Sequence, residues 1–200
     1  MRPIAVVVLA GGEGRRMGGG KPLRMLEGRP LIEHALEIAR CQSSLVAVAV
    51  QSPAQVDHRS DVVLLPDAPQ PRGPLAGLVS ALAFAERCGE DVVLTLPCDA
   101  PRLPADLGHR LLNGLGPRDQ VAMAQSNGRL HPVCAVWRVS VRPVLDAYLV
   151  SGRASLKGLA SLAGMAVVDW GSLSPDPFVN LNTLQDLAAV QRAGGLPSRG

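Results

Sequence analysis

The chain has 200 residues, of which 47% are hydrophobic and only 2% aromatic, and its formal net charge is +3. This length suits one compact domain with a core of alanine, valine and leucine. The small charge, the scarcity of aromatic residues and the absence of a basic run beyond Arg15-Arg16 argue against a nucleic-acid-binding protein.

The predicted elements alternate between short valine-rich strands and helical patterns. Strands are expected at residues 4–10, 45–50, 62–65, 92–96, 121–124 and 133–137. Helices are expected at residues 31–39, 75–85, 107–115 and 141–150, with a last helix around 187–190. Thr183 and Asp186 resemble a capping box before that last helix. Continuous apolar strands that alternate with helices predict a doubly wound α/β fold, with a mostly parallel sheet and helices on both of its faces. We expect one domain over residues 1–193, followed by a frayed tail at 194–200.

Cysteine spacing and apolar run lengths limit the cellular setting. The four cysteines, at positions 41, 88, 98 and 134, are far apart and form no C-x-x-C pair. We interpret them as small buried apolar residues in a reducing compartment. No apolar run approaches the roughly 18 residues of a membrane span, and no signal peptide is recognised. We therefore expect a cytoplasmic protein without membrane association.

A glycine-rich segment follows the first predicted strand. Six of the ten residues from 11 to 20 are glycine, and Arg15, Arg16 and Lys21 add positive charge. Backbone N–H groups of such a segment can surround phosphate oxygens. The Walker pattern, G-x-x-x-x-G-K-S/T, does not fit because Arg15 stands at its first glycine and Pro22 follows Lys21. The dinucleotide-binding pattern, G-x-G-x-x-G, does not fit because Met17 stands at its third glycine. The segment therefore predicts a phosphate site that is neither a P-loop nor a dehydrogenase site.

Two aspartates follow predicted strands at the edge where α/β sheets bind ligands. Asp99 lies in Pro97-Cys98-Asp99 after the strand at 92–96, and Asp67 follows the strand at 62–65. Magnesium prefers one or two carboxylates together with phosphate oxygens and water. Asp99 is therefore the candidate metal ligand, with a turn-forming aspartate as the alternative, and Asp67 on this evidence alone is a helix-side or turn aspartate.

Several motifs together carry a family resemblance. They are L-A-G-G at residues 9–12, R-M-G at 16–18 followed by Lys21, G-R-P-L at 28–31, G-P-L-A-G at 73–77, P-C-D-A-P at 97–101 and F-V-N-L-N-T at 178–183. In this order they span nearly the whole chain and resemble the molybdenum cofactor guanylyltransferases. That family transfers GMP from Mg-GTP to the terminal phosphate of the molybdenum–pterin cofactor and releases pyrophosphate.

The resemblance implies roles for individual residues. The residues that would bind the nucleotide are Leu9, Ala10, Gly11, Gly12, Lys21, Gln51, Asp67 and Asp99. Asp99 would also hold Mg²⁺, and Lys21 with Arg16 would stabilise the leaving pyrophosphate. His131, Asn180 and Asn182 would face the pterin side.

Several of these roles have alternatives. His131, placed just before a strand, is otherwise a turn residue, and the asparagines otherwise cap the last helix or bind backbone groups. Ser52 is the alternative to Gln51 as a contact to the base or ribose.

One departure leaves the substrate open. Family members usually carry an aspartate before the lysine, whereas Gly20 precedes Lys21 here and one residue is missing. A cytidylyl- or other nucleotidyltransferase with a different phosphate acceptor therefore remains an alternative, as does a non-catalytic nucleotide-binding protein. The expected small-molecule partners are GTP and the molybdenum–pterin cofactor, and the expected protein partners are molybdoenzymes or other cofactor-handling proteins.

Overall fold

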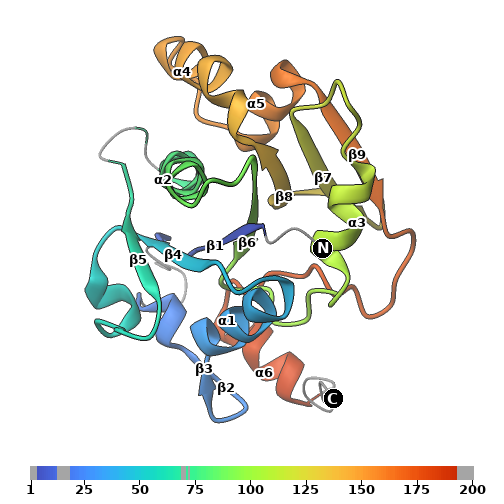
Figure 1. Ribbon diagram of the computed structural model, residues 1–200. Coiled ribbons are helices and arrows are strands. Elements are labelled where there is room, and N and C mark those ends of the chain that lie inside the picture. Colours follow the sequence, from blue (N-terminus) through green and yellow to red (C-terminus); the bar gives the residue numbers. More distant parts are fainter. Residues whose placement is uncertain (1–3, 13–18, 69–70, 72, 193–200) are drawn as a thin grey trace.

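A seven-stranded sheet forms the centre of the protein (Figure 1). The computed structural model describes residues 4–12, 19–68, 71 and 73–192. In sheet order the strands are β5 (Val63–Pro66), β4 (Val46–Val50), β1 (Ala5–Leu9), β6 (Val92–Pro97), β8 (Arg129–Arg138), β7 (Val121–Ser126) and β9 (Met165–Asp169). All neighbouring pairs are parallel except those of β8, which is antiparallel to both β6 and β7. The predicted mostly parallel sheet is confirmed.

Helices cover both faces of this sheet. They are α1 (Leu31–Gln42), α2 (Pro74–Arg87), α3 (Leu107–Gly114), α4 (Arg142–Val150), α5 (Leu156–Ala163) and α6 (Leu184–Arg192). Figure 1 shows α1 and α3 on one side of the sheet and α2, α4 and α5 on the other. Val6 and Val8 of β1 join the core cluster under α1 and α3, whereas Ala5 and Val7 join the cluster under α2. These four side chains are completely buried, as a strand covered on both faces requires.

The antiparallel direction of β8 follows from a two-residue turn. Asn127 and Gly128, with φ of 49° and 71°, connect β7 directly to β8. A turn with two positive φ values matches the twist of a hairpin, and Asn-Gly is its favoured sequence. The strand therefore begins at Arg129, four residues before the predicted start at 133. His131, which we expected to precede a strand, lies inside β8.

One helix and three strands were missing from the sequence prediction. α5 and β9 follow α4, and β2 (Met25–Leu26) pairs with β3 (Arg29–Pro30) in a small separate hairpin. β9 is a five-residue edge strand that pairs only with β7 and is only partly buried, so its apolar pattern is weak. The hairpin strands have two residues each, too few for any periodicity to be detected.

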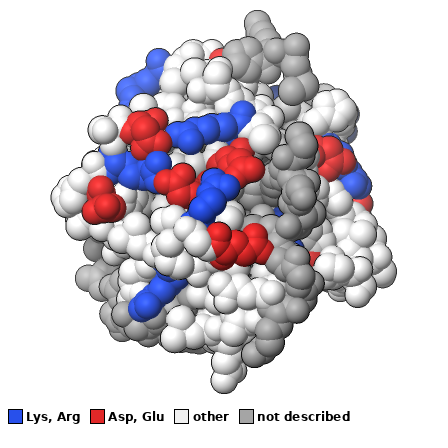
Figure 2. All heavy atoms as spheres, turned by 90° about the horizontal axis from the view of Figure 1, so that it is seen from below, with Lys and Arg blue, Asp and Glu red and all other residues white. Residues whose placement is uncertain are grey.

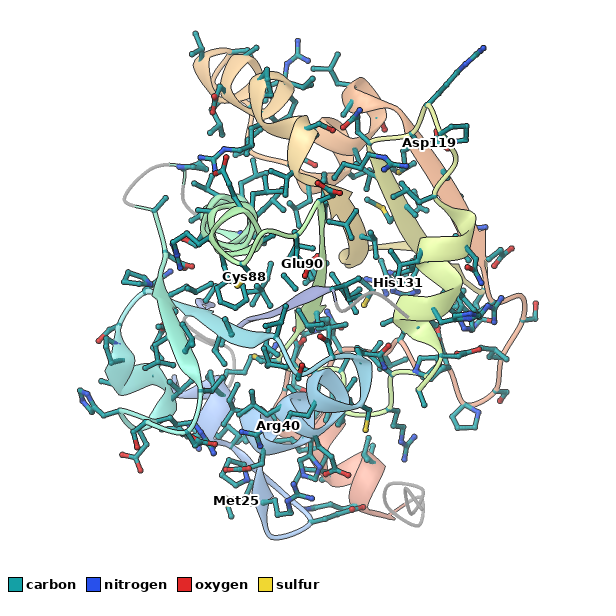
Figure 3. The ribbon with its side chains drawn as sticks, viewed as in Figure 1. Met25, Arg40, Cys88, Glu90, Asp119 and His131 are labelled. Atoms are coloured by element: carbon teal, nitrogen blue, oxygen red, sulfur yellow. The ribbon has the colours of Figure 1, made fainter. Side chains whose placement is uncertain are left out.

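The prediction that all four cysteines are buried is correct for only two of them. Cys98 and Cys134 are buried, but Cys41 is exposed near the end of α1 and Cys88 is half-buried at the C-cap of α2. Both exceptions lie at helix ends, where the helix surface leaves the core, and Figure 3 labels Cys88 beside α2.

The last helix holds the preceding asparagine segment against the sheet. Thr183 Oγ1 accepts a hydrogen bond from the Asp186 N–H at 3.1 Å, and Asp186 Oδ2 accepts one from the Thr183 N–H at 2.8 Å. This confirms the predicted capping box, with Thr183 as the cap. On its apolar side α6 packs Leu187 against Leu26 and Leu31. The N–H of Leu181 donates to the Asp99 carbonyl at 2.8 Å, which fixes the segment beside the end of β6.

Charged side chains of both signs alternate on the face seen from below in Figure 1 (Figure 2). Exposed ion pairs include Arg29 with Glu37 at 2.9 Å and Arg40 with Asp61 at 2.8 Å. Figure 3 shows Arg40 by α1 and Met25 at the outer hairpin. Over the described ranges, no helix combines the length and apolar character needed to cross a membrane.

Candidate active site

The carboxyl ends of three parallel strands surround a pocket of about 230 Å³. Its wall includes Leu9, Gly11, Gly12, Lys21, Asp67 and Asp99. Leu9 and the glycines end β1 or follow it, Asp67 follows β5, and Asp99 follows β6. Open α/β sheets bind ligands at this edge. The structure therefore brings together six of the residues that the sequence analysis assigned to the nucleotide.

The other expected nucleotide contacts do not line this pocket. Ala10 is 1% exposed, lies in the core under α1, and donates its N–H to the Ala49 carbonyl at 2.9 Å. Gln51 is exposed after β4, and its N–H donates to Gln55 Oε1 at 2.7 Å. Arg16, proposed to stabilise pyrophosphate, lies outside the described residues.

A residue missed in the sequence lies beside the glycine-rich segment. Gln55 donates from Nε2 to the Gly11 carbonyl at 3.5 Å. Its Oε1 also accepts from the N–H of Ser52, while the Ser52 hydroxyl accepts from the Ala54 N–H, which makes a capping box around a short 3₁₀ turn. The S-P-A-Q spacing was the available signal. The Ser52 hydroxyl only accepts a bond in this cap and keeps its own proton to donate, so Ser52 stays an alternative to Gln51 as a ligand contact.

Lys21 connects two distant segments at the centre of the pocket. Its Nζ forms an ion pair with the Asp99 carboxylate and donates to Asn182 Oδ1 at 2.9 Å. The side chains of Lys21 and Asp99 are only 13% and 11% exposed. A partly buried cation beside a carboxylate and an amide oxygen forms a compact polar centre. The Asn182 side chain thus belongs to this centre, and Thr183 caps the helix instead.

Gly20 places Lys21 in this position. It adopts the left-handed conformation, with φ of 59°, as the residue before the 3₁₀ turn Lys21–Leu23. Glycine reaches this conformation without a steric penalty. The glycine that replaces the expected aspartate is therefore compatible with the buried position of the lysine.

Asp67 carries a strained carboxylate in the same pocket. Its Oδ1 is buried and has no hydrogen-bond partner among the described residues, and burial raises the pKa of this carboxyl. A Cβ atom on Gly11 would collide with Asp67 Oδ2. The backbone at Gly11 thus lies close to the Asp67 carboxylate, and Asp67 retains capacity to accept hydrogen bonds from a ligand.

The N-terminus of α2 closes another side of this pocket. Gly73 and Pro74 begin the helix at the pocket wall, and Gly77 also lines it. A Cβ atom on Gly77 would lie 2.9 Å from Leu9 Cδ2, so only glycine lets the helix pack this closely on the end of β1. The first N–H groups of a helix lack internal partners and favour anions nearby.

The thiol beside Asp99 is not a nucleophile at neutral pH. Burial and the neighbouring Asp99 charge raise the pKa of Cys98 to about 12. The thiol therefore stays protonated, and the site contains no activated cysteine.

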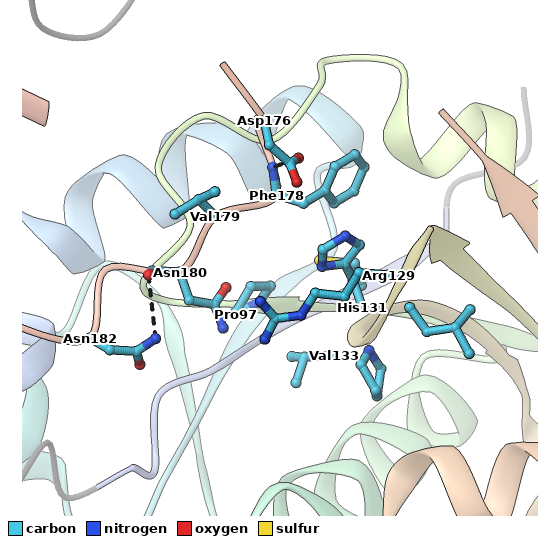
Figure 4. Close-up of a pocket in the computed structure, with 12 residues that line it drawn as sticks. Pro97, Arg129, His131, Val133, Asp176, Phe178, Val179, Asn180 and Asn182 are labelled. Carbon is cyan, nitrogen blue, oxygen red and sulfur yellow. Dashed lines mark hydrogen bonds between the residues drawn. The ribbon is translucent and has the colours of Figure 1, made fainter. Parts of the chain in front are cut away.

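A second pocket of about 140 Å³ adjoins the first (Figure 4). The two pockets share Pro97, Val133 and Asn180 in their walls. Figure 4 shows Arg129 and His131 extending from β8 toward the segment that carries Phe178 and the two asparagines. The expected pterin-side residues His131, Asn180 and Asn182 all line this pocket.

Arg129, Asp176 and Phe178 also line the second pocket but were not predicted as site residues. Arg129 and His131 alternate along β8, so the period of two in a strand was the signal for Arg129. Asp176 and Phe178 come from an irregular segment that offers no comparable pattern.

Fold and site define a nucleotidyltransferase, and comparison with known proteins gives the family. Residues 6–166 match the MobA-like NTP transferase domain. A molybdenum cofactor guanylyltransferase from Cereibacter sphaeroides is 39% identical over 188 residues, covering 92% of this chain and 94% of that protein. One from Rhodobacter capsulatus is 38% identical, with coverage of 94% and 95%. The chain belongs to the MobA-like NTP transferase family.

Solved structures share the fold. Molybdopterin-guanine dinucleotide biosynthesis protein A from Archaeoglobus fulgidus superimposes with a TM-score of 0.77 at 21% identity, covering 96% of this chain and 98% of that one. The 2-C-methyl-D-erythritol 4-phosphate cytidylyltransferase of Thermus thermophilus gives a TM-score of 0.71 at 18% identity, with coverage of 96% and 98%. At these identities the likeness concerns the fold.

Proposed function

We propose that the protein transfers GMP from GTP to the terminal phosphate of the molybdenum–pterin cofactor. The observation that carries the proposal is the pair of adjoining pockets with a common wall at Pro97, Val133 and Asn180. The pocket with the glycine-rich segment takes the triphosphate, and the pocket beside Arg129 takes the acceptor. The guanylyltransferases to which the chain is 38–39% identical support this choice of substrates.

The reaction needs no covalent intermediate with the protein. An oxygen of the acceptor phosphate forms a bond to the α-phosphorus of GTP while the bond from that phosphorus to the leaving pyrophosphate breaks. Catalysis then consists of alignment and charge neutralisation. Lys21 supplies positive charge at the phosphates, and Asn182 holds its Nζ in place. Asp67 binds donor groups of the nucleoside through its unpartnered oxygen.

The residues present fit a magnesium ion that is bound mainly through substrate. Among the described residues no cluster of three or more His, Cys, Asp or Glu side chains could hold a metal alone. Mg²⁺ in phosphoryl-transfer sites commonly uses one or two carboxylates and the phosphates. Asp99, at the pocket wall, would hold the ion, which would neutralise charge on the phosphates.

Pyrophosphate release from purified protein tests this function. The reaction contains Mg²⁺, the molybdenum–pterin cofactor and one of GTP, CTP or ATP. We expect pyrophosphate release with GTP, and a loss of about 100-fold or more in kcat for Asp99→Asn. The control Asp61→Asn, which replaces a carboxylate paired with Arg40 at the surface, should keep full activity. A preference for CTP, no release with any nucleotide, or full activity of Asp99→Asn would refute the proposal.

Three wider expectations accompany the proposal. They are one domain over residues 1–193, a cytoplasmic location and delivery of the product to molybdoenzymes. Each stays a prediction.

A further inference from the structure

Three side chains form a hydrogen-bonded chain at the edge of the second pocket. Ser126, the completely buried last residue of β7, places its Oγ 2.8 Å from His131 Nε2. The same Oγ lies 2.9 and 3.0 Å from the two carboxylate oxygens of Asp176. The hairpin thus brings Ser126 and His131 together, and the segment after β9 adds the carboxylate.

Counting protons assigns the direction of these bonds. Burial opposes the charge of Asp176, but the N–H of Phe178 at 3.0 Å and the side chains of Ser126 and Asn127 together outweigh burial and hold the pKa of this carboxyl below its usual value. The carboxylate is therefore ionised and can only accept. Because a hydroxyl has one proton, Ser126 donates it to Asp176 and accepts from His131. His131 Nε2 must then carry a proton, and the neutral ring leaves Nδ1 as an acceptor.

The surroundings of His131 favour this neutral form and fix the ring. Burial lowers its pKa, opposed by the charge of Asp176 and assisted by that of Arg129. One face of the ring stacks on Phe178, with centroids 4.7 Å apart and an interplanar angle of 20°. Trp170 in turn meets Phe178 edge-on at 5.1 Å. The imidazole is thus held at Nε2 and on one face.

The remaining nitrogen has no partner in the described part of the chain. Nδ1 makes no hydrogen bond there and is not among the buried unsatisfied atoms, so solvent can reach it. His131 lines the second pocket, and Figure 4 shows its ring there beside Phe178 and Arg129. The pocket therefore offers a hydrogen-bond acceptor on His131 and a cation on Arg129.

We propose that Ser126 and Asp176 are positioning residues that hold His131 as an Nε2–H tautomer, so that Nδ1 selects an acceptor substrate with an N–H donor on a flat heterocycle. This inference rests on the proposed function, because it places the acceptor in the second pocket. Arg129 binds an anionic group of the same ligand. The three-residue chain acts on recognition of the acceptor and leaves recognition of the nucleotide unchanged.

Ring ¹⁵N NMR of full-length protein tests the tautomer without any reaction. We expect a protonated Nε2 and an unprotonated Nδ1 in wild-type protein, a mixture of tautomers in Ser126→Ala, and a change in the Nδ1 shift when the molybdenum–pterin cofactor is added but not with GTP. A protonated Nδ1 in the wild type, or an Nδ1 shift that ignores the acceptor, overturns the inference. These readouts stand even if no pyrophosphate is released, which separates this inference from the proposed function.

Steady-state kinetics provide the second test, with a matched control. His131→Ala and Ser126→Ala should each raise KM for the acceptor about 10-fold, the scale of one hydrogen bond, with KM for GTP within 2-fold of wild type. The control Ser140→Ala removes a different serine hydrogen bond, from Ser140 Oγ to Gln120 Oε1 at 2.7 Å, at an exposed position just beyond β8. It should keep the wild-type tautomer and acceptor KM. Equal increases in both KM values for His131→Ala would instead indicate a merely structural ring and refute the proposal.

Discussion

Replacing Asp67 by asparagine should stabilise the protein while weakening nucleotide binding. The Oδ1 atom is buried without a partner among the described residues, and desolvating an ionised carboxylate costs up to several kcal/mol, a cost that a neutral amide avoids. Because Asp67 is only half-buried, solvent screening reduces this to about 1 kcal/mol. For a chain of 200 residues this corresponds to an increase in Tm of about 2–4 °C at pH 8. We expect a simultaneous loss of GTP affinity, because the pocket loses the Asp67 carboxylate as a hydrogen-bond acceptor.

The pH dependence of this gain has a defined sign. Burial raises the pKa of Asp67 in the folded protein, so the cost of its charge is fully present above that pKa and disappears as pH falls below the unfolded value of about 3.9. The Tm difference between Asp67→Asn and wild type should therefore be largest at pH 8 and shrink toward pH 4. Thermal unfolding followed by circular dichroism across this range measures it.

A nearby aspartate provides a control of opposite sign. Hydrogen bonds from Arg59 and then Arg40 hold the pKa of Asp61 below its usual value. Its charge contributes stability that is present above the unfolded pKa and is lost as pH falls. Asp61→Asn should thus lower stability at pH 8, by about 0.5 kcal/mol for this exposed pair. If Asp67→Asn were less stable than wild type at pH 8, or its gain did not depend on pH, the reasoning about the strained carboxylate would be refuted.

Three further changes probe packing and exposure. His34→Ala should lower the free energy of unfolding in urea by about 2–4 kcal/mol, because His34 is buried and its Nε2 lies in a hydrogen bond with the Leu26 carbonyl at 2.9 Å. The control His109→Ala, at an exposed position, should change this free energy by less than about 0.5 kcal/mol. Gly77→Ala should leave the free energy of unfolding unchanged or lower it by about 1 kcal/mol in the same assay, because the new methyl meets Leu9 Cδ2 at 2.9 Å and this contact offsets the roughly 1 kcal/mol that alanine gains over glycine in a helix; a full gain of about 1 kcal/mol would contradict the close packing of α2. Thiol labelling at pH 8 should modify exposed Cys41 in the native protein but reach Cys98, with its pKa raised to about 12, only after unfolding.

Local patterns in the sequence were enough for most of the fold. The runs that became β1 and β6 are apolar without alternation because both faces of these strands are covered. The Thr183–Asp186 spacing gave the start of the last helix, because capping depends on residues three apart. Such features depend only on near neighbours in the chain, so they can be read before any tertiary contact is known.

Some features were present in the sequence but were not used. Asn127-Gly128 between two apolar runs is a strong hairpin signal and explains why β8 is antiparallel. The Asn-Gly turn predicts a strand that starts at Arg129. His131 then lies two residues further along β8, on the same face as Arg129.

The strand and helix pattern, the glycine-rich segment and the aspartates at the strand ends can all be read from the order of the residues. Which of these side chains meet depends on the tertiary structure. Lys21 and Asn182 are 161 positions apart, and Ser126 and Asp176 are 50 apart, yet both pairs form hydrogen bonds. The physical reason is that such contacts, and the pKa shifts that burial causes, depend on how whole layers pack together. No local period or spacing records that packing.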